Sequence, residues 1–237
     1  MLNLHWKKIS LIAVLAILSF AANAQIRGTY NYLDFASKPY YFGITLAYNT
    51  SSFQPYQSSR FFTSDSIRGV EGLYGQGFNL GIVTNLKIGQ HFDFRFLPTL
   101  SFADRTLQYS TDSGLLIPKR VEAVFFEMPF HVRYKSEPYK DLRVFVVGGV
   151  KYSFDVASKS RIRQDANSIK VAPTDFAVEL GAGVQFFFPY FIFSPEIKFS
   201  QGVSNGLIYN EDLEFSNILD KVLSRTFTIS FHFRKHG

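Results

Sequence analysis

The sequence has no cysteine among its 237 residues. This absence excludes a disulfide framework, a thiol nucleophile, a cysteine-ligated metal and a lipid-modified cysteine anchor. The sequence also lacks a Gly/Ser-rich or Pro-rich tract that would separate two domains, which predicts a single domain. Positive charge is in only modest excess, since the formal net charge of +6 includes Lys7 and Lys8 of a segment that we expect to be cleaved off. Nucleic-acid binding is therefore not predicted.

The N-terminal segment 1–24 has the three parts of a secretory signal peptide. Basic residues precede an apolar run from Ile9 to Phe20, and Ala22-Asn23-Ala24 forms a small-residue cleavage site. The alternative, a membrane anchor helix, requires roughly 20 apolar residues, and this run is shorter. We therefore expect cleavage after Ala24 and export of residues 25–237 as one domain.

Aromatic residues are the abundant class in this composition. The chain has 27 Phe and 13 Tyr, and aromatic residues make up 17% of it. So many aromatic side chains are unusual for an exported protein that is dissolved in water and has no disulfides. The composition instead favours a protein whose solvent is hydrocarbon.

The segment from Asp175 to Ser200, DFAVELGAGVQFFFPYFIFSPEIKFS, shows the pattern on which the chain is built. Large apolar residues alternate with small or charged ones from Phe176 to Phe186, and again from Phe191 to Phe199. Between the two runs, Phe187-Phe188-Pro189-Tyr190 leaves room only for a tight turn. Alternation of this kind predicts an antiparallel hairpin with one apolar, aromatic face and one small or charged face.

The same alternation recurs along the chain and predicts eight strands. Their ranges are 40–49, 76–86, 91–103, 124–135, 142–154, 175–186, 191–200 and 224–234. Short turns (87–90, 136–141, 187–190) alternate with long loops (50–74, 104–120, 155–173, 201–223). This plan is typical of an eight-stranded antiparallel outer-membrane β-barrel with periplasmic turns, outer loops and both termini in the periplasm.

Alternation alone leaves open which face of the barrel points outward. A soluble barrel of the lipocalin type would place the apolar face inside. The bulk of the Phe, Tyr and Leu side chains favours the opposite arrangement, because eight strands leave a narrow lumen. We therefore predict lipid outside and a lumen plugged by charges of both signs that neutralise one another. These are Asp93, Arg95, Glu127, Arg133, Lys135, Arg143, Lys151, Asp175, Glu179, Glu196 and Lys198.

Candidate chemical sites have structural interpretations that we favour. Glu179 and Glu196 on neighbouring strands suit an acid/base pair, but inward carboxylates of a small barrel more often form ion pairs. His131 and His232 share the lumen face, yet no third metal ligand accompanies them. The GLYGQG segment from Gly72 has no following helix, as a phosphate loop requires. The sequence therefore predicts no enzyme, metal, cofactor or small-molecule substrate.

Three prolines interrupt otherwise regular strands. Because a closed barrel has no free edge, Pro98, Pro129 and Pro195 predict either bulges or an irregular wall. We hypothesise that Pro195 and the neighbouring turn form a face that docks a partner; the turn residues are Phe188, Pro189 and Tyr190. The basic loop 155–173, with Lys159, Arg161, Arg163 and Lys170, suits contact with lipopolysaccharide phosphates, although a solvated loop face is the default interpretation.

Several segments resemble one family. They include FFEMPFHVRYKS from Phe125, the stretch from Asp175 to Asn205, and SRTFTISFHF from Ser224. Together with KPYYFGI from Lys38 and the segments that begin at Leu80 and Leu142, they are similar to the PorT proteins. These are outer-membrane barrel proteins of the type IX secretion system of Bacteroidetes. The likeness covers nearly the whole mature chain, and the long loops match poorly.

The resemblance implies a non-enzymatic part in assembling or operating a machine that exports folded proteins across the outer membrane. Other subunits of that system would be its partners, alongside outer-membrane lipid and lipopolysaccharide. It brings no catalytic residue to this chain. Two alternatives stay open: a surface receptor or adhesin that binds through long loops such as 60–71, and an outer-membrane protease or lipid-modifying enzyme.

Overall fold

A computed structural model describes residues 31, 39–58, 67–112, 115–156, 172–207 and 219–235. The expected signal peptide lies outside these residues, as do the four basic side chains of the loop 155–173. Within the described ranges, no helix combines the length and the apolar character needed to cross a membrane.

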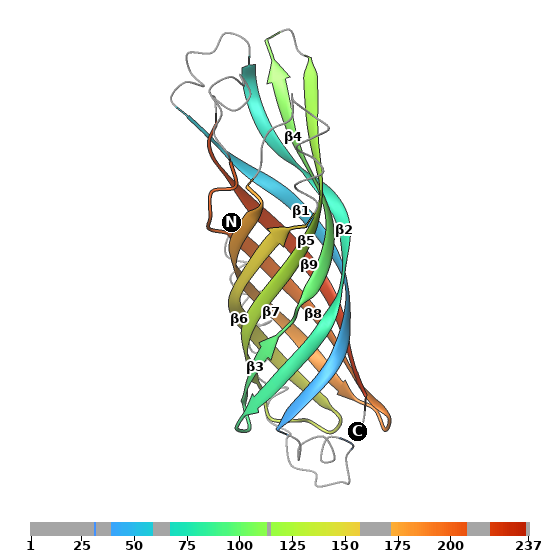
Figure 1. Cartoon of the computed structure of the whole chain (residues 1–237). Helices are drawn as coiled ribbons and strands as arrows, with labels where there is room; N and C mark the ends of the chain where they lie inside the picture. Colours follow the sequence, from blue (N-terminus) through green and yellow to red (C-terminus); the bar gives the residue numbers. More distant parts are fainter. Residues whose placement is uncertain are drawn as a thin grey trace, which may run out of the picture.

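The described residues form nine strands in one sheet, and each strand runs antiparallel to its neighbours. Figure 1 shows them as a tall cylinder whose strands are tilted relative to its axis. The strands are Tyr40–Gln57 (β1), Ile67–Ile88 (β2), Phe92–Phe96 (β3), Thr99–Thr111 (β4), Leu116–Lys135 (β5), Leu142–Asp155 (β6), Thr174–Phe187 (β7), Phe191–Gly202 (β8) and Leu219–Lys235 (β9).

The sheet closes on itself, because β1 pairs with β2 on one side and with β9 on the other. β3 and β4 occupy one place in the ring, since both pair with β2 and with β5. The ring therefore has eight strands, and the predicted eight-stranded antiparallel barrel is confirmed.

Side chains alternate between the two faces of the wall as extended strands require. On β1, Phe42, Ile44 and Leu46 are exposed, whereas Tyr41 and Thr45 are buried. Aromatic pairs stack across neighbouring strands on the outer face; the ring centroids of Phe78 and Phe102 lie 4.5 Å apart. The outer face is apolar and the lumen is polar. The prediction that the apolar face points outward, toward lipid, is therefore confirmed.

Pro98 and Pro129 make the wall irregular without shifting its register. The β3–β5 pairing ends at Phe96↔Phe130, and the β4–β5 pairing begins at Thr99↔Glu127 in the same register. In the gap, Leu97 N donates to the carbonyl of Pro129 at 3.2 Å, which preserves the ladder despite the missing proline N–H.

Pro195 has a similar local effect. The β7–β8 pairing is interrupted between Gly183↔Glu196 and Phe186↔Phe193, and it resumes in the same register. The register shifts of the wall lie elsewhere, at Tyr56/Gln57 and between Tyr74 and Gly77 among others. Of the two predicted outcomes, the prolines therefore produce local irregularity rather than bulges.

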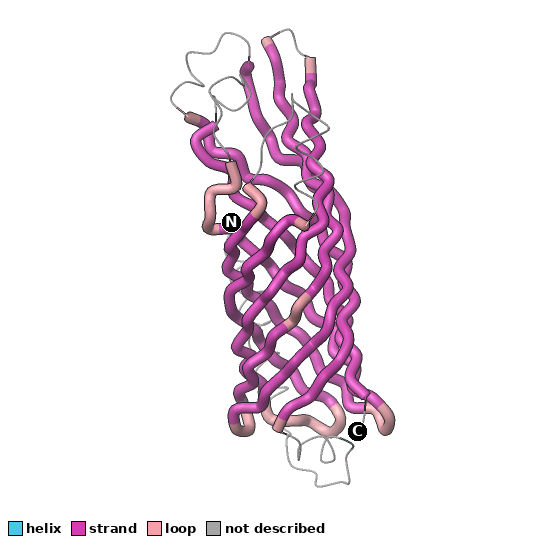
Figure 2. The backbone as a smooth tube through the Cα atoms, in the orientation of Figure 1, coloured by secondary structure: helices cyan, strands magenta, loops and turns pink. Residues whose placement is uncertain are grey.

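Two of the predicted long loops, 50–74 and 104–120, are mostly strand, and that prediction was wrong. β1 continues to Gln57 and β2 begins at Ile67, while β4 reaches Thr111 and β5 begins at Leu116. β9 also begins earlier than predicted, at Leu219. These strands rise beyond β6, β7 and β8 at the upper end of Figures 1 and 2, opposite the short turns.

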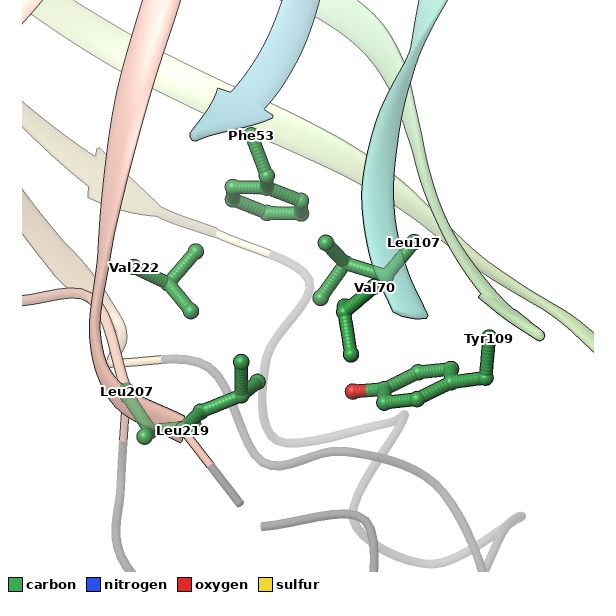
Figure 3. Packing of buried hydrophobic residues seen from close by; sticks show 7 residues of the cluster. All are labelled: Phe53, Val70, Leu107, Tyr109, Leu207, Leu219 and Val222. Atoms are coloured by element: carbon green, nitrogen blue, oxygen red, sulfur yellow. The ribbon is translucent and has the colours of Figure 1, made fainter. Parts of the chain in front are cut away.

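The prediction failed there because the polarity of the wall inverts. Above the membrane-facing part, Leu107 and Tyr109 point inward and are buried, whereas the alternate residues Thr106 and Gln108 are partly exposed. We call the part of the wall in which β1, β2, β4, β5 and β9 continue beyond the other strands the outer extension. An apolar cluster fills its inside (Figure 3). It comprises Phe53, Val70, Leu107, Tyr109, Leu207, Leu219 and Val222. Water surrounds the wall at this height, so apolar side chains are buried inside it.

The GLYGQG segment lies inside β2 and not in a loop. A Cβ at Gly77 would overlap the carbonyl of Phe102 and the side chain of Asn49. The missing side chain allows close approach beside the register shift that precedes Gly77. The sequence predicts these glycines at a loop-to-strand junction, where they relieve crowding in the barrel wall; the crowding is present at Gly77, but the segment is strand and not a junction with a loop.

The two polarity zones predict opposite responses to an added outward charge. Leu180, midway along β7 and 65% exposed, should lose about 2–4 kcal/mol of folding free energy when changed to Arg, because the charge enters hydrocarbon. Gln108→Arg on the outer extension is the matched control and should be close to neutral. Urea unfolding in lipid vesicles measures both. Equal costs at the two positions would contradict the assigned membrane zone.

Candidate functional site: the lumen and the two ends of the barrel

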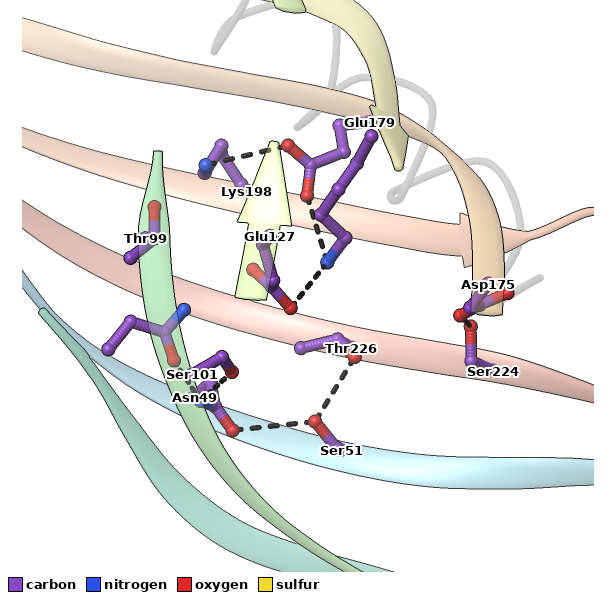
Figure 4. A network of polar contacts seen from close by, with 12 residues as sticks. Asn49, Ser51, Thr99, Ser101, Glu127, Asp175, Glu179, Lys198, Ser224 and Thr226 are labelled. Atoms are coloured by element: carbon purple, nitrogen blue, oxygen red, sulfur yellow. Dashed lines mark hydrogen bonds and ion pairs between the residues drawn. The ribbon is translucent and has the colours of Figure 1, made fainter. Parts of the chain in front are cut away.

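The middle of the lumen holds an ion-pair network around Glu179. Its Oε2 lies 2.6 Å from His131 Nε2 and 3.5 Å from Lys198 Nζ. Lys151 Nζ lies 3.3 Å from Glu179 Oε1 and 3.2 Å from Glu127 Oε1, so it bridges two carboxylates (Figure 4). All five side chains are buried. Charges removed from water in this way are tolerable because each one has partners of opposite sign.

A second ion pair lies nearer the short turns. Arg95 Nη2 is 2.5 Å from Glu196 Oε2, and His232 Nε2 is 3.5 Å from the same oxygen. The side chains of Arg95 and Glu196 are 1% and 0% exposed. Phe145 separates this pair from the next layer, and the guanidinium of Arg95 lies 5.9 Å from its ring centroid.

The third layer forms the mouth of the barrel at the short turns. Asp93 binds both Arg133 and Lys135, with 2.5 Å from its Oδ1 to Lys135 Nζ. Arg133 Nη2 also donates to the Tyr41 hydroxyl at 2.6 Å. Arg143 donates to two backbone carbonyls in the turns, Ser136 at 2.6 Å and Gln90 at 2.7 Å.

Toward the outer end the lumen holds a layer of neutral polar side chains, then Arg105 between two rings, and then the apolar cluster. Asn49 donates to Asn79, and the hydroxyls of Ser51 and Thr226 lie 3.1 Å apart (Figure 4). Above them the Arg105 guanidinium lies between the rings of Phe53 and Phe125, at 5.2 and 4.8 Å from their centroids. Sequence reasoning missed Arg105 by assigning it to a loop. The signal was present, because Arg105 continues the inward parity of Ser101 and Ala103.

The structure brings the predicted lumen residues together. Among the described contacts, Arg143 donates to turn carbonyls, and the other eight of the nine principal lumen charges take part in ion pairs. These are Asp93, Arg95, Glu127, Arg133, Lys151, Glu179, Glu196 and Lys198. Asp175, a further predicted lumen charge, accepts hydrogen bonds from Ser204, at 2.9 Å, and Ser224.

The two candidate chemical pairs fall into separate environments. Glu196 is bound by Arg95, and Glu179 by Lys151 and Lys198, so the two carboxylates do not face a common space. His131 and His232 each accompany one of these carboxylates. Within the described ranges, no group of three or more His, Asp or Glu residues is arranged to hold a metal. The arrangement favours a structural role for all four.

The aromatic turn between β7 and β8 projects from the lower end of the wall. Tyr190 is 81% exposed and Phe188 is 41% exposed, and their neighbour Pro189 is exposed as well. Pro195 lies higher on β8 and is partly buried in the outer wall. The predicted partner face therefore consists of an exposed turn and a separate wall position, with the ring of Phe193 between them.

A family match agrees with this architecture. The family described as outer membrane protein beta-barrel domain matches residues 23–207. The chain belongs to this family. It is a small protein of the bacterial outer membrane, and members of this class of barrel are typically not enzymes.

Solved structures similar to this barrel are distant in sequence. The outer membrane protein OprG from Pseudomonas aeruginosa has a TM-score of 0.44 at 11% identity, over 81% of this chain and 95% of its own. Neisserial surface protein A has 0.41 at 10% identity, with the same coverages of 81% and 95%. The attachment invasion locus protein Ail of Yersinia pestis has 0.36 at 13% identity, over 83% and 99%. No curated protein matches the chain.

The buried pair in the barrel should matter far more to stability than an exposed one. Glu196→Ala leaves the Arg95 guanidinium buried without its carboxylate and should cost about 3–5 kcal/mol of unfolding free energy. Asp112→Ala breaks the exposed Arg68–Asp112 pair, and about 1 kcal/mol or less should be lost. Unfolding in detergent or vesicles gives both values, and similar losses would show that the lumen pair is not structural.

Proposed function

We propose that this barrel is a non-enzymatic component of a type IX secretion system, needed to assemble or operate the machine that exports cargo across the outer membrane. The observation that carries the proposal is the likeness to the PorT proteins along nearly all of the mature chain. Its two most specific segments are YFIFSPEIKFS from Tyr190 and SRTFTISFHF from Ser224, which lie along β8 and β9. These strands are paired along most of their length, with Phe193 opposite Phe233 and Ile197 opposite Ile229, so the segments form one continuous part of the wall.

The filled lumen supports a role at surfaces rather than a role as the conduit. Eight strands leave room only for side chains, and ion pairs and rings occupy successive layers from Asp93 to Arg105. A folded cargo protein has no path through such a barrel. The component therefore acts by contacting other subunits through its turns, outer wall or outer extension.

The exposed aromatic turn is the surface that best suits a permanent partner. Aromatic residues are enriched where protein interfaces bury their central contacts, and Tyr190 projects far from the wall. The turn lies at the same end as the other short turns, and short turns are typically periplasmic in outer-membrane barrels, which supports a periplasmic position for it. The partner of this surface is thus a periplasmic or membrane subunit of the machine.

This assignment is tested by affinity purification from detergent-solubilised outer membrane, with partners identified by mass spectrometry. The wild-type barrel should recover a large translocon barrel and its associated subunits. Phe188→Ser/Tyr190→Ser should reduce that recovery at least about tenfold, because hot-spot truncation costs 2 kcal/mol or more. Export of many cargo proteins should fall with it.

Tyr139→Ser is the matched control, because Tyr139 is an exposed aromatic residue in the neighbouring β5–β6 turn. It should leave recovery and export unchanged. Pro195→Ala tests the wall position separately from the turn. If the double variant and Pro195→Ala both keep wild-type recovery and export, the proposed partner face is wrong. Normal cargo export in a deletion strain would contradict the secretion role itself.

The outer extension favours one second candidate, a surface receptor or adhesin. The β4–β5 hairpin rises well beyond β6 and β7, and its Leu107 and Tyr109 belong to the apolar cluster inside the outer extension, so it offers a firm platform on the cell exterior. A ligand-binding role would reside in this end of the molecule, whereas the proposed secretion role resides in the periplasmic end.

Trimming the hairpin distinguishes the two roles. Replacing residues 110–116 by Asn-Gly joins Tyr109 to Ile117, which already pair, and retains the buried Tyr109 ring. We expect wild-type insertion, subunit recovery and cargo export from this variant. Loss of cell-surface adhesion with normal export would instead favour the receptor, and lost export despite normal insertion would contradict a periplasmic site of action.

A further inference from the structure

The seam at which the barrel closes is paired over only part of its length. β1 is paired with β2 from Tyr40 onward, and β9 is paired with β8 as far as Lys235. The ladder between β1 and β9, however, begins only at Ile44↔Phe233. Among the described residues, the two strands therefore part from each other at the short-turn end, which is the lower end in Figure 1.

A groove of about 570 Å³ lies on the outer wall over this end of the seam. Residues of β1 and β2 line one side of it, and residues of β8, β9 and the β7–β8 turn line the other. The apolar lining residues are Phe42, Ile44, Ile82, Tyr190, Phe191 and Phe233. The groove lies beside the first residues of β1 and β8 and the last residues of β9, so it is at the edge of the membrane-facing zone.

A concave apolar surface differs from the rest of a lipid-facing wall. Inside a bilayer, the hydrophobic effect does not favour one part of the wall over another, because hydrocarbon contacts all of it. An acyl chain in a groove is contacted from several sides, however, and gains more dispersion contacts than a chain on a convex wall. A chain in this groove is therefore held more firmly than the chains around it.

Lys235, the last residue of β9, also lines the groove. It is exposed and continues the outward row of Phe231 and Phe233. Its neighbour Arg234 has the opposite orientation, with the guanidinium 4.1 Å from the ring centroid of Tyr41. A lysine at the membrane edge places its ammonium among lipid phosphates while its aliphatic stem stays against the apolar wall. The groove thus has a cationic end at the level of the lipid headgroups.

We propose that this groove is a binding site for one membrane phospholipid, whose acyl chain lies over the seam between β1 and β9 and whose phosphate binds Lys235. The apolar lining matches the chain, and the ammonium at its end matches the phosphate. An apolar side chain of a partner protein would fill the groove but would give Lys235 no anion. The site does not depend on the proposed secretion role.

Fluorescence quenching in the purified mature barrel tests the site. The single tryptophan of the sequence, Trp6, lies in the expected signal peptide, so one introduced tryptophan is the only reporter. Tyr190→Trp places it at the groove. Tyr134→Trp is the matched reporter, because Tyr134 is an exposed tyrosine near the short turns and outside the groove. Phosphatidylglycerol with brominated acyl chains is titrated into each barrel in dodecyl maltoside. Quenching should saturate at low lipid content for Tyr190→Trp and rise in proportion to lipid content for Tyr134→Trp.

Two further changes in the Tyr190→Trp barrel test the two parts of the site. Lys235→Gln should weaken the apparent lipid affinity about fivefold, because it removes the ammonium that binds the phosphate. Phe42→Ala should also weaken it, because one side of the groove is lost. Lys140→Gln and Phe92→Ala are the matched controls and should have no effect, since both residues are exposed near the short turns and outside the groove. Heat-modifiable gel mobility verifies that each variant is folded.

Photo-crosslinking in cells identifies the occupant. Benzoylphenylalanine in place of Phe42 should give more phospholipid adduct than the same change at Phe92. A protein adduct at Phe42, whether to a subunit or to a second copy of this chain, would overturn the proposal, and so would equal phospholipid adducts at the two positions. Proportional quenching of both tryptophan reporters, or an affinity that Lys235→Gln leaves unchanged, would also contradict it.

Discussion

Satisfaction of backbone hydrogen bonds in hydrocarbon is the constraint on which the rest of this structure depends. An unpaired amide or carbonyl in lipid costs several kcal/mol, so a sheet can cross a membrane only when it has no edge. Pairing of β1 with β9, from Ile44↔Phe233 upward, removes that edge. Closure with eight strands then leaves a lumen just wide enough for side chains, and the wall must tolerate Pro98, Pro129 and Pro195 without an edge to absorb them.

A narrow closed lumen makes charge balance a structural requirement. Buried ions are stable only with partners, and the central layers around Glu179 and Glu196 meet this condition by pairing each carboxylate with lysine or arginine. The outer face of the wall must match its surroundings instead. Apolar side chains are needed where it contacts lipid, and polar side chains are tolerated where the outer extension contacts water. Leu180 and Gln108 represent those two zones.

Much of the fold and lumen could be predicted because the two-residue period of a strand maps sequence parity directly onto the wall's two faces. Parity places Glu127, Glu179 and Glu196 inside, whatever their partners. It does not say which cation each one meets, because that depends on the stagger of nonadjacent strands; Arg95 and Glu196 are 101 positions apart and on strands that are not neighbours. The outer extension was missed for a related reason. Its inward residues, such as Leu107 and Tyr109, are apolar. Strands predicted from apolar residues on the outward face therefore ended where the wall passes from lipid into water.

The sequence by itself determined the strand alternation, the number of barrel strands, the apolar exterior and the charged interior, because each of these follows from residue type and spacing along one strand. The tertiary structure alone decided the ion-pair partners, the length of the outer wall, and the collection of Lys87, Arg143 and Arg234 at one mouth. Those features join residues from strands far apart in the chain. Only the closure and stagger of the barrel bring these residues to the same level along the barrel axis. The alternation of residues within one strand does not specify that level.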